Sequence, residues 1–255
     1  MSFKKINQNL KTEFLIQKIV NEKYQGNRSC IKKTELKRLK QGEPIDYIIG
    51  FVPFLNCQID LRYKPLIPRP ETEWWTEQML KKITHSKIKC LDLFSGSGCI
   101  GIAILKNKPQ AHVDFADIDI KCLKQIKINL KLNNINLKRY HVIKSDVFSK
   151  INKKYDLITA NPPYVSDKKN NLKLKTVLKY EPKKAILANK NGLKYIKIFL
   201  LEANKHLKPN GIIYLEYDSC QKKEIEKILK KYPYSEYQFY HDQFNRWRYL
   251  VIKKI

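Results

Sequence analysis

The sequence lacks the signatures of several protein classes. No stretch approaches the roughly 18 uninterrupted apolar residues of a membrane-spanning helix, and Met1–Leu10 contains no apolar segment of the kind found in secretory signals. The six cysteines form no C-x-x-C pair and the five histidines no His-x-x-x-His spacing, so we expect no metal site. We therefore expect a cytoplasmic protein that has reduced cysteines and does not bind a membrane.

Arginine is also scarce, although the formal net charge is +27. Only 7 of the 51 basic residues are arginine, and arginine is the residue that recognises phosphates and base edges in a bidentate manner. The lysines are spread along the whole chain instead of forming a cluster. Two explanations stay open, namely lysine-rich codon usage in an AT-rich genome and a basic surface that faces the ribosome or RNA.

Apolar spacing divides the chain into three parts. Residues 3–23 and about 34–40 have helical spacing, and Gln41–Pro44 interrupts it, so residues 1–44 are predicted to form a small helical unit. Residues 45–70 are predicted to form a β-hairpin linker. Its strands would contain Tyr47–Val52 and Cys57–Leu61, and prolines 65, 68 and 70 would stiffen its end. Residues 71–255 remain for the main domain.

The main domain alternates between apolar strands and amphipathic helices. This rhythm favours an α/β fold with a mostly parallel sheet that is covered on both faces. The last two strand-like runs, 236–241 and 246–253, are joined by a short connector and predict a terminal antiparallel hairpin. The other predicted strands are 88–93, 111–116, 140–144, 155–160 and 211–217, and the predicted helices are 71–83, 98–106, 119–132, 192–206 and 220–231.

A glycine-rich loop follows the first of these strands. Gly96, Gly98 and Gly101 match the G-x-G-x-x-G spacing, which lets a backbone approach a ligand at a helix N-terminus, and Asp117 ends the next strand. A dinucleotide would suit this layout. However, Asp92 lies four residues before Gly96, where a carboxylate would repel a pyrophosphate and attract the ammonium group of S-adenosylmethionine. The loop therefore favours S-adenosylmethionine, and a dinucleotide stays open as the alternative.

The tetrapeptide Asn161-Pro162-Pro163-Tyr164 directly follows the strand 155–160. In a parallel sheet this position lies at the edge where ligands bind. The Asn161 side-chain oxygen and the Pro162 carbonyl could each accept one N–H of a planar amide or amine, and Tyr164 could pack against it. Asn161, Pro162 and Tyr164 are therefore the predicted catalytic residues, and all four residues the predicted substrate site. We predict N-methyl transfer that depends mainly on orientation.

Three segments give the sequence a resemblance to a known family. They are Ile67–Glu73 (IPRPETE), Glu43–Gly50 (EPIDYIIG), and Tyr180-Glu181-Pro182 followed by Gly192-Leu193. With the glycine loop and the tetrapeptide, they resemble the protein-(glutamine-N5) methyltransferases that act on peptide-chain release factors. The resemblance implies a Rossmann-like class I methyltransferase fold, with residues 1–44 as a substrate-recognition unit.

The resemblance also implies a reaction and the residues that perform it. The expected reaction is methylation of the glutamine in the Gly-Gly-Gln motif of release factors, by a monomer, with Asn161 to Tyr164 binding that glutamine and Val147 near the adenine. Phe94 departs from the family, which usually has glycine there. The expected cofactor site comprises Asp92, Phe94, Ser95, Gly96, Ser97, Gly98, Asp117, Asp146, Val147 and Asn161.

The alternative function is a DNA adenine-N6 or RNA amino-methyltransferase. An exocyclic amine poses the same geometric problem as an amide, so the same tetrapeptide could serve it. Such an enzyme would have to extrude a base and would need a recognition module. No obvious module is present, so nucleic acid is not expected to be the substrate, although the positive charge leaves direct contact with nucleic acid open.

Overall fold

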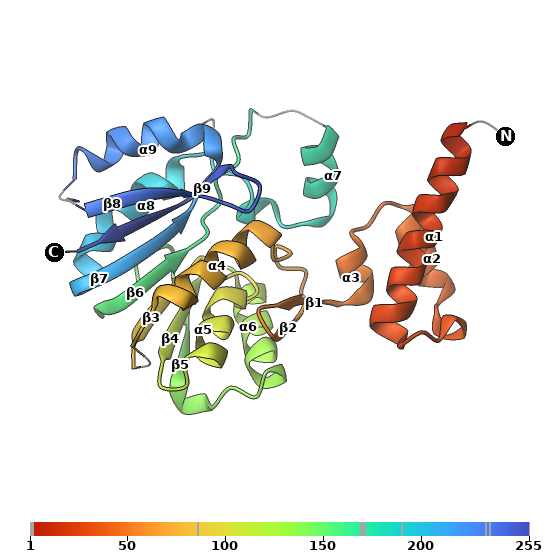
Figure 1. The fold of residues 1–255 in the computed structure, drawn as a ribbon, viewed down its shortest axis with the longest axis horizontal. Helices are drawn as coiled ribbons and strands as arrows, with labels where there is room; N and C mark the ends of the chain where they lie inside the picture. Colours follow the sequence, from red (N-terminus) through yellow and green to blue (C-terminus); the bar gives the residue numbers. More distant parts are fainter. Residues whose placement is uncertain are drawn as a thin grey trace. The chain divides into compact units, whose positions relative to one another are not determined.

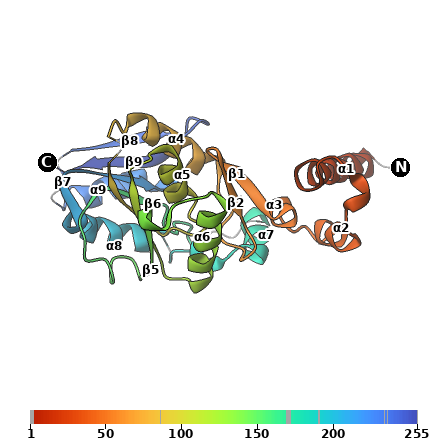
Figure 2. The ribbon, with the colours of Figure 1, turned by 90° about the horizontal axis from the view of Figure 1, so that it is seen from below.

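The computed structural model describes residues 3–85, 87–168, 172–189, 191–232, 234 and 236–254. The chain forms two compact units, Met1–Val52 and Pro53–Ile255. Figures 1 and 2 show the elements of both units, coloured along the sequence.

The first unit is helical. It contains α1 (Phe3–Tyr24), the short 3-10 helix η1 (Arg28–Cys30), α2 (Lys33–Lys40) and α3 (Ile45–Ile49). Its buried apolar residues come from α1, α2 and α3 and include Ile19, Leu39 and Ile48. The buried Glu35 accepts hydrogen bonds from the Tyr24 hydroxyl and forms an ion pair with Lys23 at 2.9 Å. A charged pair therefore links α1 to α2.

One element of the linker was predicted incorrectly. Residues 47–49 were expected to belong to a strand, but they lie in α3, which ends at Gly50 in the left-handed conformation (φ 99°). Tyr47, Ile48 and Ile49 are all buried, so tertiary packing overrides the strand preference of these residue types.

The predicted hairpin is confirmed in a shorter form. Its strands are β1 (Phe51–Phe54) and β2 (Cys57–Asp60). Leu55 and Asn56 both have positive φ, 45° and 63°, as in the tight turns that match the twist of a hairpin. Two buried asparagine side chains, Asn129 of α6 and Asn133 at its C-cap, accept hydrogen bonds from the backbone of β2. Within the larger unit, these bonds hold β2 against the C-terminal end of α6.

The larger unit is built on a seven-stranded sheet. The strand order is β5-β4-β3-β6-β7-β9-β8, in which the first five strands are parallel and β9 pairs antiparallel with both β7 and β8. The mostly parallel sheet and the terminal antiparallel hairpin are thus as predicted. The strands are β3 (Lys89–Leu93), β4 (His112–Asp117), β5 (Tyr140–Lys144), β6 (Tyr155–Ala160), β7 (Leu207–Glu216), β8 (Glu236–His241) and β9 (Trp247–Lys253).

Helices cover both faces of this sheet. In Figures 1 and 2, α4, α5 and α6 lie on one face and α8 and α9 on the other. The helices are α4 (Pro70–Lys82), α5 (Cys99–Asn107), α6 (Ile120–Leu132), α7 (Leu172–Tyr180), α8 (Lys194–Glu202) and α9 (Lys222–Leu229), with 3-10 turns η2 (Leu137–Arg139), η3 (Lys183–Ala185), η4 (Ala203–His206) and η5 (Ser219–Gln221). Helix α7 had not been predicted. The layering brings the loops after β3, β4, β5 and β6 to one edge of the sheet.

Candidate active site

A cavity of about 260 Å³ lies at this edge of the sheet. Nine residues predicted for the site line it, at the end of β4 and in the loops after β3, β5 and β6. They are Phe94, Ser95, Gly96, Ser97, Asp117, Asp146, Val147, Asn161 and Pro163. The structure thus brings the glycine loop and the tetrapeptide to one cavity. Asp92, Gly98, Pro162 and Tyr164 were also predicted for the site but do not line this cavity.

Backbone conformation and a serine shape the glycine loop. Phe94, Gly96 and Gly98 all have positive φ, of 57°, 54° and 81°. For Phe94 the left-handed conformation costs about 1–2 kcal/mol, which glycine would not incur. Its ring packs edge-on against Tyr195, with 6.0 Å between ring centroids. The Ser95 hydroxyl donates to the carbonyl of Asp92 and accepts from the amide of Ala116, so it ties the loop to both β3 and β4.

The two acids at the loop have different positions. Asp117 lines the cavity, and its Oδ2 accepts the Gly96 amide at 2.9 Å. Asp92 lies behind the loop and has no exposed surface. Its carboxylate accepts hydrogen bonds from the Gly101 amide and the Thr159 hydroxyl, both at 3.1 Å. Burial raises the pKa of Asp92 to about 7, against those two hydrogen bonds, and also raises the pKa of Asp117.

The loop after β5 contains another non-glycine residue in the left-handed conformation, as Phe94 is in the glycine loop. Val147 has φ 47°, which is a strained conformation for a β-branched side chain. The Ser145 hydroxyl donates to the Val147 carbonyl at 2.7 Å, and Val147 is buried in the apolar core. These contacts hold the strain in place. Val147 and Asp146 consequently stand on the cavity wall beside Asp117.

The tetrapeptide separates into two parts. Asn161 and Pro163 line the cavity, whereas Pro162 is buried and is not part of the cavity wall. The Asn161 Nδ2 donates to the Thr72 hydroxyl at 3.2 Å. Tyr164 donates its hydroxyl to Glu216 at 3.0 Å and does not line the cavity.

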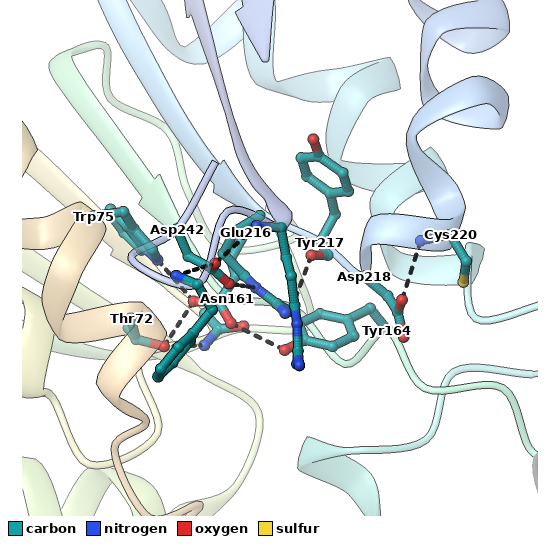
Figure 3. A network of polar contacts seen from close by, with 12 residues as sticks. Thr72, Trp75, Asn161, Tyr164, Glu216, Tyr217, Asp218, Cys220 and Asp242 are labelled. Atoms are coloured by element: carbon teal, nitrogen blue, oxygen red, sulfur yellow. Dashed lines mark hydrogen bonds and ion pairs between the residues drawn. The ribbon is translucent and has the colours of Figure 1, made fainter. Parts of the chain in front are cut away.

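A buried polar network behind the tetrapeptide was not predicted from the sequence (Figure 3). Its centre is Glu216, the last residue of β7, which is 1% exposed. Glu216 Oε2 accepts from the Thr72 hydroxyl at 2.6 Å and from Trp75 Nε1 at 2.7 Å, and Oε1 accepts from Tyr164. Burial raises the pKa of Glu216, and these three donors and the nearby Arg248 oppose the rise. Tyr164 thus contacts the buried carboxylate of Glu216 directly, and Asn161 is linked to the same carboxylate through the Thr72 hydroxyl.

A second buried acid joins two segments of the cavity wall. Glu181 forms an ion pair with Arg69 at 2.6 Å and accepts the backbone amide of Ile67 at 3.0 Å. Residues 66–69 line the cavity, and so do Pro182 and Lys184, which follow Glu181. Glu181 and its two partners, Ile67 and Arg69, lie in the segments quoted above for the resemblance. Glu181 therefore connects the part of the cavity wall formed by residues 66–69 to the part formed by Pro182 and Lys184.

No helix in the described part of the chain is long and apolar enough to span a membrane.

Comparison with known proteins gives a consistent result. Residues 73–189 match the model of the methyltransferase small domain. The chain is 34% identical to the release factor glutamine methyltransferase of Streptococcus pneumoniae over 85% of this chain and 77% of that protein. It is 37% identical to the release factor glutamine methyltransferase of Thermodesulfovibrio yellowstonii, over 78% and 71% of the two chains.

Solved structures agree on the fold. The 16S rRNA N2 G1207 methyltransferase of T. thermophilus, solved in complex with AdoMet and guanosine, superimposes with a TM-score of 0.58 at 16% identity, over 80% of this chain and 50% of that one. The predicted Rossmann-like class I methyltransferase fold is thereby confirmed. Because relatives more than 30% identical are covered over more than two thirds of their length, the chain belongs to the family of release factor glutamine methyltransferases.

Proposed function

We propose that the protein transfers a methyl group from S-adenosylmethionine to the side-chain N5 of the glutamine in the Gly-Gly-Gln motif of peptide-chain release factors. The observation that carries this proposal is the position of Asn161, which directly follows β6 and lies on the wall of the same cavity as the glycine loop and Asp117. The names of the relatives support the substrate.

The cavity wall suits S-adenosylmethionine. Asp117 and Asp146 offer carboxylate oxygens to hydroxyl groups at the ends of β4 and β5, and Ile118 and Val147 offer apolar surface to a flat ring. The carboxylates of Asp117 and Asp146 on the wall, and that of Asp92 buried behind the glycine loop, disfavour a pyrophosphate. When bound, this cofactor supplies an electrophilic methyl group. The residues that would hold it are those of the glycine loop, Asp117, Asp146 and Val147.

The tetrapeptide then orients the nucleophile. A carboxamide nitrogen is a poor nucleophile because its lone pair is delocalised into the carbonyl. Asn161 Oδ1 would accept one N–H of the glutamine and the Pro162 carbonyl the other, which directs the lone pair toward the cavity. Fixing this geometry can supply about 7–11 kcal/mol of the barrier reduction. Transfer would form a bond between nitrogen and the methyl carbon as the methyl–sulfur bond breaks. The positively charged nitrogen would then release its proton to solvent, so a strong base is not required.

We also propose that the helical unit contributes to recognition of the release factor. Two apolar side chains one turn apart on α1, Leu10 and Phe14, are 64% and 70% exposed. They offer a contact surface that the core of the unit does not use.

The substrate can be identified with methyl-labelled cofactor. The protein is incubated separately with a release factor, with its Gly-Gly-Gln variant in which glutamine is replaced by alanine, and with duplex DNA or RNA. Label on the release factor alone is expected. Label that persists on the alanine variant would overturn the proposal, and label in nucleic acid would support the alternative amino-methyltransferase.

Replacement of Asn161 tests the catalytic role. Asn161→Ala removes the acceptor and should lower kcat by about 10²- to 10³-fold, the size of effect seen when one oriented polar group is lost. The dissociation constant for the cofactor should change little, because the glycine loop and Asp117 remain. Asn136→Ala, at an exposed turn outside the cavity wall, is the control. Equal turnover of the two variants would refute the role of Asn161.

A further inference from the structure

Asn161 can act on a carboxamide only in one orientation. Its side chain has an accepting end, Oδ1, and a donating end, Nδ2, and only the oxygen can accept a substrate N–H. If the Asn161 amide were rotated by 180°, its NH2 group would face the substrate nitrogen, which also carries hydrogens and needs an acceptor. Something must therefore fix the direction of this side chain.

We propose that Thr72 and Glu216 are positioning residues that hold the Asn161 amide with its oxygen facing the substrate nitrogen. This inference rests on the proposed function and adds to it the residues that orient the catalytic asparagine.

Trp75 fixes the direction of the hydrogen bonds around Glu216. An indole N–H can only donate, so the Glu216 Oε2 atom at 2.7 Å from it must accept. The Thr72 hydroxyl lies 2.6 Å from the same oxygen. The other carboxylate oxygen receives the Tyr164 hydroxyl at 3.0 Å. With three donors directed at it, Glu216 serves as an acceptor only.

The single hydrogen of the Thr72 hydroxyl is consequently committed to Glu216. Toward Asn161, Thr72 Oγ1 has only lone pairs to offer, and the partner at 3.2 Å must be a donor. The Asn161 Nδ2 satisfies this requirement. In the reverse orientation two oxygens without a hydrogen between them would face each other.

Burial and charge make this arrangement difficult to replace. Thr72 is 2% exposed and Glu216 1%, so bulk water does not compete for their hydrogen bonds. Arg248, which is paired with Asp242 at 3.1 Å, lowers the pKa of Glu216 against the larger, raising effect of burial. Figure 3 shows this network behind Asn161. Asn161 Oδ1 accepts no hydrogen bond from any residue in the described ranges, so it remains available to the cavity.

The test uses three variants of helix α4 in the full-length protein, with methyl transfer to a release factor as the readout. Thr72→Val removes the hydroxyl and keeps the shape, and Thr72→Ser keeps the hydroxyl. Thr76→Val is the matched control, because the Thr76 hydroxyl is also buried on α4 but donates to the Thr72 backbone carbonyl at 2.7 Å. Thermal melting of each variant establishes that it folds.

Thr72→Val should lower kcat by about 10- to 100-fold, as expected when a reacting group loses its orientation. Binding of the cofactor, measured by calorimetry, should change far less. Thr72→Ser should recover most of the loss, and Thr76→Val should stay within about twofold of the parent protein, because its hydroxyl does not contact Asn161. If Thr72→Val loses no more than Thr76→Val, or if serine does not rescue it, the proposal is wrong.

Glu216→Gln distinguishes positioning from a direct role of the charge. Trp75 would force the amide oxygen of the new side chain into the Oε2 position, so Thr72 would still donate there and Asn161 would keep its orientation. Its kcat should therefore fall less than that of Thr72→Val. A larger fall would mean that the carboxylate acts by its charge and not through Thr72.

Neutron diffraction reads the orientation without turnover. The expected result is one deuterium between Thr72 and Glu216 and two on the Asn161 atom that faces Thr72. The opposite arrangement would overturn the positioning proposal even if the release factor is methylated. If the release factor is not methylated but the deuterium positions are as expected, the proposed substrate fails and the orientation stands.

Discussion

Replacing Asp92 by asparagine should stabilise the protein at alkaline pH while weakening cofactor binding. Asp92 is completely buried, and its pKa is raised from the ordinary 3.8 to about 7, mainly by burial. Between these two values the folded protein keeps the proton and the unfolded chain does not, so stability falls as the pH rises through this window. At about 1.4 kcal/mol for each pH unit, the charged carboxylate costs the folded state about 4 kcal/mol above pH 7.

Asparagine fits the site without this cost. Its oxygen can accept the Gly101 amide, and its nitrogen can donate to the Thr159 hydroxyl, which are the two present partners of Asp92. The variant should therefore match the parent protein in free energy of unfolding near the ordinary carboxyl pKa. It should exceed the parent by up to about 4 kcal/mol once the pH is about one unit above the folded pKa.

Urea denaturation across this pH range, without cofactor, measures the stability difference. Calorimetry measures cofactor affinity, which in the parent protein should increase as the pH rises through about 7, because ionised Asp92 attracts a cationic ligand. The asparagine variant should lose this increase. A variant that is less stable than the parent at alkaline pH, or a stability difference that does not change with pH, would refute the reasoning.

Two further substitutions test the supports of the cavity wall. Glu181→Gln removes the charge that pairs with Arg69. Since Arg69 is one-third exposed, we expect the free energy of unfolding in urea to fall by about 1 kcal/mol, and cofactor binding measured by calorimetry to weaken. If neither quantity changes, the contacts of Glu181 do not support the cavity wall. Gly192→Ala places a methyl group against the Tyr164 carbonyl at φ 70°, so thermal melting should show a loss above about 2 kcal/mol and kcat should fall. Gly26→Ala, at φ 89° in open space, reports the backbone cost alone and should lose less.

The sequence was sufficient for the parallel sheet because its signals are local. Each parallel strand is a short apolar run next to an amphipathic helix, and this rhythm predicts the layers without knowledge of contacts. The prediction was wrong at residues 47–49, where the side chains favour a strand by type. There the choice depends on packing against α1 and α2, which a local pattern does not contain.

The site could be located from the sequence, but the contacts of its side chains could not. Parallel strand ends meet at one edge, so the glycine loop, Asp117 and Asn161 were expected to share a cavity. Asp92 was expected beside the ligand. In the sheet it pairs with Thr159 of β6, and this register directs its carboxylate to Thr159 and Gly101 instead. Strand register is a tertiary property, and the motif alone does not reveal it.

Glu216 gave no local signal at all, because 144 residues separate it from Thr72 along the chain. Its position nevertheless accounts for the residue type at position 161. The buried network requires a donor where it meets Thr72, and a substrate carboxamide requires an acceptor on the opposite side. A carboxylate at that position would present oxygen to both, and one oxygen would face the lone pairs of Thr72. A carboxamide is a small side chain that carries one group of each kind, so asparagine suits both the acceptor network behind the loop and the substrate carboxamide in front of it.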